Sequence, residues 1–124
     1  MKISKERLEK IQEQVALKDR AAFALGVAMV EYELEKLRLT NREVEMTQRE
    51  RLERLGAVQS EFDGYRDAHM KVVVKASAAQ KALGEAALAE LGLASKTRVF
   101  TIDQSNGEVM ELVAGAYVPV EEAA

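Results

Sequence analysis

The stretch AAFALGVAMV, residues 21–30, contains no charged side chain, although it lies between Arg20 and Glu31 in a chain rich in Glu, Lys and Arg. A helix on the surface of a small protein normally keeps one polar face toward water. This stretch is apolar on every side of a helix. One packing partner would cover only one side of such a helix, so the question is what covers the other side. The answer concerns the architecture and assembly of the protein rather than reaction chemistry.

The composition is typical of long helices. The 124 residues are enough for one domain. Apolar residues make up 48% of the chain and charged residues 31%, so the chain is not disordered by composition. Aromatic residues make up only 5%, and Ala, Leu, Val, Glu, Lys and Arg dominate, as in coiled coils. A core built from these residues is thin, and we expect partner helices to share it.

A heptad repeat is the strongest pattern in the sequence. Its positions are separated by alternating steps of four and three residues, which is the a/d spacing of a coiled coil. Fifteen of the nineteen positions are apolar or Tyr, so the pattern predicts long helices that pack along this stripe. The positions are Phe23, Val27, Val30, Leu34, Leu37, Asn41, Val44, Gln48, Arg51, Leu55, Val58, Phe62, Tyr65, His69, Val72, Ala76, Ala79, Leu83 and Ala86.

Three of the four polar heptad positions, Asn41, Gln48 and Arg51, cluster in TNREVEMTQRERLERLG, residues 40–56. We expect the apex of a long helical hairpin near this stretch, with the chain turning between residues 54 and 64. One alternative is a single unbroken helix of about 90 residues. Another is a turn at FDGY, residues 62–65, because Asp-Gly favours turns. An earlier turn would instead make Thr40 and Glu43 a capping box at the start of the second helix.

Residues 1–95 are predicted to be this helical coiled-coil region. Ser4 is expected to cap its N-terminus. Gly92 in ELGLAS, residues 90–95, is expected to adopt the left-handed conformation that ends a helix.

A period-two alternation in TRVFTIDQSNGEVMELV, residues 97–113, predicts a small C-terminal β-hairpin over residues 96–116. Asn106-Gly107 suits its turn. An isolated hairpin is marginal in water, so its apolar side chains should pack on the helices or on a partner's hairpin. Residues 117–124 are expected to form a mobile acidic tail. The packing residues are expected to be Phe100, Ile102, Met110 and Leu112.

Two antiparallel helices cover only one stripe of each other, which leaves residues 21–30 with an exposed apolar side. A bundle of several copies of the chain would cover that side. We therefore predict a mainly α-helical homo-oligomer. The residues expected between copies are Phe23, Val27, Val30, Leu34, Leu37, Val72, Ala76 and Leu83.

The chain shows no arrangement of residues that indicates catalysis. His69 is the only histidine and falls on the heptad stripe, where a polar residue more often sets helix register than binds a metal. Asp63 and Asp67 form an acidic cluster that Arg66 can neutralise. DQSNGE, residues 103–108, is too short for a calcium loop. We predict no catalytic, cofactor-binding or metal-binding residues and no cofactor, and expect a non-enzymatic protein.

Charge and hydropathy restrict the expected partners and location. The net charge is −3, without the basic stripe that binds nucleic acid. The acidic C-terminal end disfavours an anionic membrane surface, and residues 21–30 are too short to cross a bilayer. The absence of cysteine fits a reducing compartment. We expect no nucleic-acid or membrane partner, and a cytoplasmic location where the protein is made.

The last third of the chain resembles a loose group of small bacteriophage coiled-coil proteins. In that group an LG element closes the helical part, and a short strand-turn-strand of the form ID…GEV follows. The resemblance implies a phage-encoded assembly or virion-associated component, with other phage structural proteins as partners and no catalytic residues. The matching residues here are Leu91-Gly92-Leu93, Phe100, Ile102-Asp103 and Gly107-Glu108-Val109.

Prefoldin is similar in outline, but its β-hairpins lie between its two helices. This difference weakens a chaperone assignment. The two alternatives to an assembly protein are a holdase-like chaperone and a small inhibitor that binds a host protein through its acidic C-terminal end.

Overall fold

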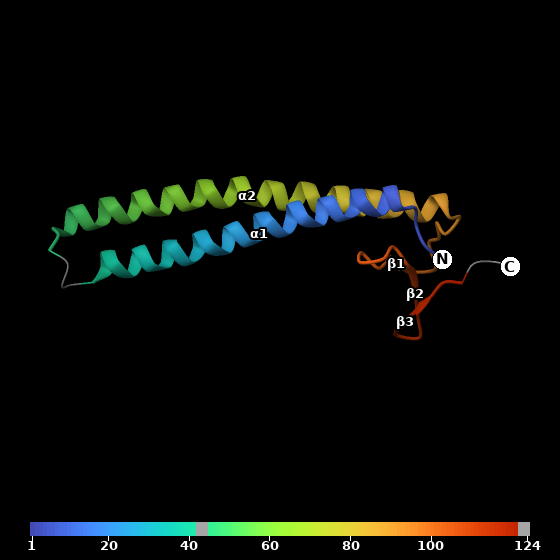
Figure 1. Ribbon diagram of the computed structural model, residues 1–124. Coiled ribbons are helices and arrows are strands. Elements are labelled where there is room, and N and C mark those ends of the chain that lie inside the picture. Colours follow the sequence, from blue (N-terminus) through green and yellow to red (C-terminus); the bar gives the residue numbers. More distant parts are fainter. Residues whose placement is uncertain (42–44, 122–124) are drawn as a thin grey trace. The chain divides into compact units, whose positions relative to one another are not determined.

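The computed structural model describes residues 1–41 and 45–121. It is mainly helical, with a small antiparallel sheet after the helices (Figure 1), which confirms the predicted fold class. Because two separate helices are present, the alternative of one unbroken helix is wrong. The elements are α1 (Lys5–Thr40), α2 (Gln48–Glu90), β1 (Phe100–Ile102), β2 (Val109–Val113) and β3 (Ala116–Pro119).

The chain divides into two units, and each helix contributes to both. Unit 1 comprises Met1–Leu17 and Lys75–Ala124, and unit 2 comprises Lys18–Val74. Unit 2 contains the chain reversal, and unit 1 contains the sheet. The units are described separately below.

The chain reverses between the end of α1 and the start of α2, earlier than the predicted range of residues 54–64. The Thr40 hydroxyl donates to the Lys36 carbonyl oxygen over 2.9 Å at the end of α1. Thr40 therefore does not begin the second helix, and Glu43 lies outside the described residues. The Thr47 hydroxyl oxygen accepts the Glu50 amide at 3.1 Å and caps α2.

Gly56 and Gly64 lie inside α2, so the turns predicted near both residues are wrong. A glycine in a helix costs about 1 kcal/mol relative to alanine. That cost is small beside the packing gained by continuing a long helix. Their helical surroundings therefore override the local turn preference of Asp-Gly.

The predicted helix ends are confirmed. The Ser4 hydroxyl oxygen accepts the Arg7 amide at 3.3 Å. Gly92 has a φ of 73°, and the amide of Leu93 donates to the Leu88 carbonyl oxygen over 2.9 Å. This is the Schellman pattern that ends a helix at a left-handed glycine.

The sheet has the strand order β1-β2-β3, and both pairs are antiparallel. The third strand occupies part of the expected mobile tail. Ile102 lies opposite Val109, so these two side chains share a face, and Val109 is fully buried. Leu112 is 38% exposed and lies, like Met110, on the opposite face. The packing face of β2 is thus one residue out of step with the predicted one, and a shift of one residue exchanges the two faces of a strand.

The core of unit 1 joins both helices, the sheet and the N-terminal segment. Its fully enclosed members are Ile3, Ile11, Ala87 and Val109, and Phe100 and Ile102 are among the half-buried side chains that pack on them. The backbone of the first three residues extends this packing, because the Met1 carbonyl oxygen accepts the Val109 amide at 2.8 Å. The three-stranded sheet is therefore anchored to the helices by apolar burial and by backbone hydrogen bonds.

Gly107 holds the β1–β2 turn against the N-terminal segment. Its φ is 78°, and its carbonyl oxygen accepts the Ile3 amide at 3.0 Å. A Cβ atom at this position would lie 3.2 Å from Leu8 Cδ2 and 3.3 Å from Ile3 Cγ1. Glycine is thus required both by the backbone conformation and by the close packing.

The α1 and α2 segments of unit 2 run antiparallel as a helical hairpin (Figure 1). Leu39 is fully buried. Tyr32 of α1 stacks on Phe62 of α2, with ring centroids 4.5 Å apart, and its hydroxyl donates to Gln59. These contacts lie along one side of each helix.

Replacing Gly107 by alanine should lower the free energy of unfolding by about 1–3 kcal/mol, because of its positive φ and the close Leu8 and Ile3 contacts. Gly56→Ala is the matched control. No atom lies within 4 Å of its added Cβ, so it should raise stability by about 0.5–1 kcal/mol. Urea unfolding followed by circular dichroism measures both, and equal effects of the two substitutions would contradict this account.

The β2–β3 turn is a two-residue turn with Ala114 at a φ of 51° and Gly115 at 82°. Positive φ at both positions is the type I′ geometry, which favours Asn-Gly. Ala114→Asn should therefore raise the free energy of unfolding by about 0.5 kcal/mol. Ala116→Asn, in β3 itself, is the control and should not raise the urea midpoint.

Candidate protein-interaction surface

Helix α1 carries two apolar stripes within unit 2. One stripe is buried or half-buried and includes Ala21, Leu25, Ala28, Tyr32 and Leu39. The other is exposed, with exposed fractions from 45% at Val27 to 76% at Phe23. At 3.6 residues per turn the two stripes lie roughly 160° apart, on opposite sides of the helix. We call the exposed set the outer stripe; its members are Phe23, Val27, Val30, Leu34 and Leu37.

The predicted heptad register follows the packed side along part of α2 but not along α1. On α2, the heptad positions Leu55, Val58 and Phe62 are half-buried. On α1 the same register selects the outer stripe. Both α1 stripes have steps of four and three residues, and the outer one carries the larger aliphatic side chains. Sequence spacing therefore could not tell which stripe meets α2.

The residues predicted to lie between copies fall into two groups. The outer stripe and Val72, which is 42% exposed, remain available to another molecule. Ala76 is only 3% exposed, and Leu83 packs on the enclosed cluster of unit 1. Ala76 and Leu83 are thus already covered within the chain, because they lie on the packed side of α2.

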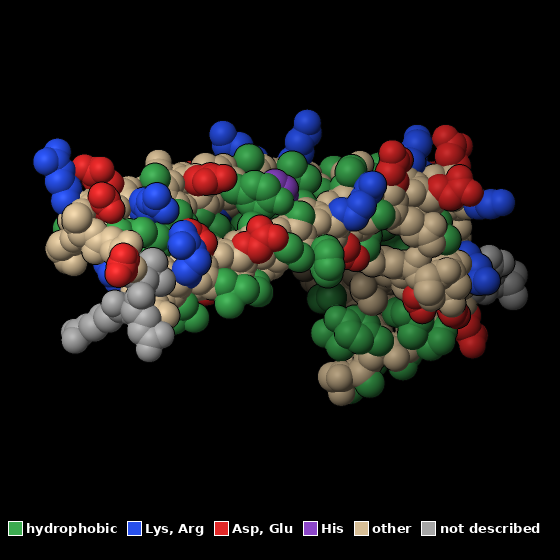
Figure 2. Space-filling model, turned by 60° about the vertical axis from the view of Figure 1, so that its left-hand side comes forward, with side chains coloured by type: hydrophobic (Ala, Val, Ile, Leu, Met, Phe, Trp, Pro, Cys, Tyr) green, Lys and Arg blue, Asp and Glu red, His purple; other side chains and the backbone are tan. Residues whose placement is uncertain are grey.

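A groove of about 680 Å³ lies between α1 and α2 in unit 2. Aromatic and aliphatic side chains form most of its lining, together with three carboxylates and no basic residue. Figure 2 shows hydrophobic side chains reaching the surface between charged ones. We call it the α1/α2 groove; its lining residues are Phe23, Ala24, Val27, Ala28, Glu31, Tyr32, Glu35, Val58, Glu61, Phe62 and Tyr65.

The three carboxylates of the groove differ in their surroundings. Arg38 donates to Glu35 over 2.6 Å, and this hydrogen bond lowers the pKa of Glu35 below its ordinary value. No ion pair in the described part of the chain involves Glu31 or Glu61. Two carboxylates on opposite helices are therefore available to a positively charged ligand.

His69 and the nearby acidic cluster have local partners. The His69 ring stacks on Tyr65, with centroids 3.9 Å apart, and its Nδ1 lies 2.9 Å from the Tyr65 carbonyl oxygen. Arg66 Nη2 lies 3.4 Å from Asp63 Oδ1, and Arg66 Nε lies 3.6 Å from Asp67 Oδ1. Arg66 thus neutralises the acidic cluster locally, as we expected from the sequence. Across residues 1–41 and 45–121, no group of three His, Cys, Asp or Glu side chains is placed to hold a metal.

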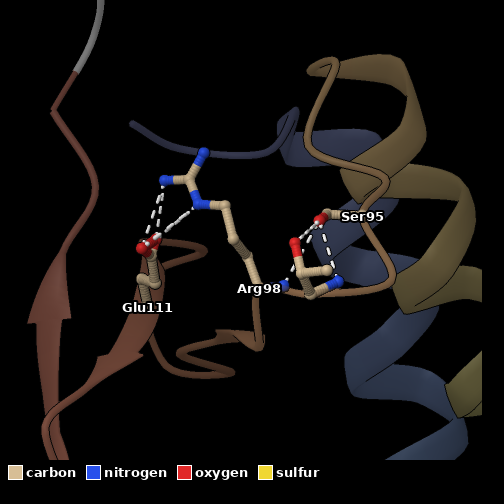
Figure 3. A network of polar contacts seen from close by, with 4 residues as sticks. Ser95, Arg98 and Glu111 are labelled. Carbon is tan, nitrogen blue, oxygen red and sulfur yellow. Dashed lines mark hydrogen bonds and ion pairs between the residues drawn. The ribbon is translucent and has the colours of Figure 1, made fainter.

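An ion pair between the helix-to-sheet connection and β2 was not predicted from the sequence. Arg98 donates from Nε and Nη2 to both oxygens of the Glu111 carboxylate, with the shortest contacts at 2.6 and 3.0 Å, and its guanidinium lies 4.9 Å from the Phe100 ring centroid. Figure 3 shows this pair beside Ser95, whose hydroxyl oxygen accepts the Arg98 amide at 3.2 Å. Opposite charges near the ends of paired strands were the signal that could have revealed it.

The turn DQSNG, residues 103–107, is closed by its own polar groups. Asp103 Oδ1 accepts the amide of Ser105 at 2.9 Å and its hydroxyl at 2.6 Å. These hydrogen bonds lower the pKa of Asp103 below its ordinary value. The carboxylate thus stabilises a β-turn, which accounts for the polar residues without a bound ion.

Comparison with protein-family models, curated proteins and solved structures finds no match for this chain. Within the described residues, neither helix combines the length and the apolar content needed to cross a membrane. The outer stripe and the α1/α2 groove are therefore interpreted from their geometry alone.

The Asp103 interactions predict a pH dependence of stability. Because the pKa of Asp103 is lower in the folded chain, its carboxylate stabilises the fold above pH 3.8, and this contribution is lost as the pH falls below that value. Asp103→Asn should lower the free energy of unfolding at pH 7 but not below the folded pKa. Urea titrations across this pH range compare the free energies of unfolding of Asp103→Asn and wild type. The difference between Asp and Asn at position 103 should be smaller when Ser105 is replaced by alanine.

Proposed function

We propose that the protein is a non-enzymatic assembly protein whose copies associate through the outer stripe into a homo-oligomeric helical bundle. Such a bundle would scaffold or bridge larger components, in keeping with the phage-encoded assembly role that the sequence resemblance implies. The observation that carries the proposal is the exposure of five large apolar side chains at heptad spacing on the side of α1 opposite α2.

The size of the outer stripe supports association. At roughly 150–200 Å² for a large apolar side chain, its exposed area is on the order of 500 Å². That is comparable with the largest apolar patch on a typical monomer, about 300–600 Å², which is often a functional surface. A symmetric contact between two copies would bury roughly 1,000 Å², the lower limit for a specific interface. Two copies can therefore shelter the stripe in a single isologous contact.

Charged residues border the stripe and favour a defined contact over general aggregation. Lys36 Nζ lies 3.7 Å from Glu33 Oε1, and Arg38 Nη2 lies 2.6 Å from Glu35 Oε1. Surface pairs of this kind contribute little to stability. They do keep the flanks of the stripe polar, which limits the apolar contact to one face of α1. An apolar centre with a polar rim is the usual arrangement of a protein interface.

The double substitution Leu34→Lys and Leu37→Lys should dissociate the oligomer. Removing two leucines per copy from a buried contact costs at least about 3 kcal/mol, which corresponds to a hundredfold or greater loss of affinity. Analytical ultracentrifugation at micromolar concentration measures the change. Both side chains are exposed within the chain, so the helical circular dichroism signal should stay unchanged.

Leu52→Lys is the control for that experiment. Leu52 is 60% exposed on α2 and lies outside the outer stripe, so its replacement should leave the oligomer intact. A wild-type protein that sediments as a monomer would overturn the proposal. If such a monomer suppressed aggregation of a model client, the holdase alternative would take its place.

A further inference from the structure

We infer that the α1/α2 groove is a docking site for a basic amphipathic helix of a different protein. This binding activity goes beyond the proposed self-association. It gives the bundle a means of attaching a second component, and it identifies that component by its chemistry: an apolar stripe flanked by Lys or Arg.

The shape of the groove suits a helix. Its lining runs from Phe23 to Glu35 on α1, which is about 18 Å or three helical turns at 1.5 Å per residue. The opposite wall extends from Val58 to Tyr65 on α2. Helix-in-groove recognition uses apolar anchors spaced three, four and seven residues apart, which span about 11 Å, the length of the α2 wall. The aromatic wall of Tyr32, Phe62 and Tyr65 provides the apolar contact for such anchors.

The charge of the groove selects a cationic occupant. Glu31 stands on α1 and Glu61 on α2, so the apolar floor has a carboxylate on each helix. No Lys or Arg is among the lining residues, and Glu35 is already paired with Arg38. The nearest cations on the aromatic wall are Lys36, 5.1 Å from the Tyr32 ring centroid, and Arg66, 5.9 Å from that of Phe62. Basic residues on both flanks of a docked helix would therefore meet carboxylates on both sides. Complementary charge of this kind chooses partners and speeds their association.

A second copy of this chain is a poorer occupant of the groove. Its outer stripe is bordered by Glu31, Glu33 and Arg38, so it would bring two carboxylates and only one basic residue toward the carboxylates of the groove. Like charges brought together in this way disfavour association. The groove thus favours a basic partner, whereas the outer stripe is the surface suited to self-association.

The two surfaces lie on different sides of α1. The groove residues Ala24, Ala28 and Glu31 are rotated by roughly 80–140° from the centre of the outer stripe. Only Phe23 and Val27 border both surfaces. A copy bound along the outer stripe would cover Phe23 and Val27 but leave the carboxylate side of the groove accessible, so both contacts can form on one molecule.

Two fluorescein-labelled peptides test the inference by fluorescence anisotropy. Each has 18 residues, which form about five turns of helix. One repeats Leu and Lys in an amphipathic helical pattern, and the other replaces each Lys by Glu. The Leu/Lys peptide should bind the full chain, and the Leu/Glu peptide should not. The double substitution Glu31→Gln and Glu61→Gln should weaken Leu/Lys binding about tenfold and reduce its salt dependence.

Glu9→Gln with Glu85→Gln is the matched control, because it removes one exposed carboxylate from each helix in unit 1. It should leave binding unchanged. Tyr65→Ala should also weaken binding, whereas Val74→Ala, at an exposed α2 position outside the groove, should not. Equal losses in the groove and control pairs, or equal binding of both peptides, would overturn the inference.

The double substitution Leu34→Gln and Leu37→Gln removes the apolar contact without placing a positive charge beside Glu31, and it separates this inference from the proposed function. It should abolish self-association without weakening the Leu/Lys peptide, since neither leucine lines the groove. If the wild-type chain associates but does not bind the Leu/Lys peptide, only the inference that the groove is a docking site is refuted. Peptide binding by a monomeric wild-type chain refutes only the assembly proposal.

Discussion

Helix α1 of unit 2 has apolar side chains on two opposite sides, whereas the described residues of unit 2 include one other helix, α2, which covers one side. Ala21, Ala28 and Leu39 lie on the side that meets α2. Phe23 and Leu37, on the other side, are among the most exposed apolar side chains in the described residues. Exposed apolar area of this extent is unfavourable in water. The proposed assembly would meet this constraint, because a second molecule would cover the exposed side.

The choice of packing side also explains the form of the groove. Where α1 meets α2 through alanine, the helices can approach closely. Where Tyr32 stacks on Phe62, the contact is built from large rings. The adjoining surface is lined by further aromatic side chains and bordered by Glu31 and Glu61. Apolar walls bordered by negatively charged carboxylates can distinguish partners by charge. A purely apolar stripe cannot make this distinction.

Unit 1 meets a different constraint, because a small sheet has little stability of its own. Val109 is fully enclosed beside Ile3 and Ile11, and the Met1 carbonyl oxygen accepts its amide. The Arg98–Glu111 pair joins the helix-to-sheet connection to β2. The sheet is thus held by apolar burial, backbone hydrogen bonds and a charged pair. No catalytic chemistry is needed to account for these polar residues.

The sequence alone determined the helical class, the helix ends at Ser4 and Gly92, and the β structure after residue 95, because each depends on nearby residues. It also identified Phe23, Val27, Val30, Leu34 and Leu37 as a coherent stripe. Only the tertiary structure decided that α2 packs on the opposite side of α1, that the chain reverses before Thr47, and that Val109 rather than Met110 faces the core. These outcomes depend on contacts between distant segments, and local spacing is the same for either side of α1. The α1/α2 groove likewise required the structure, since Glu31 and Glu61 come together only when the helices pair.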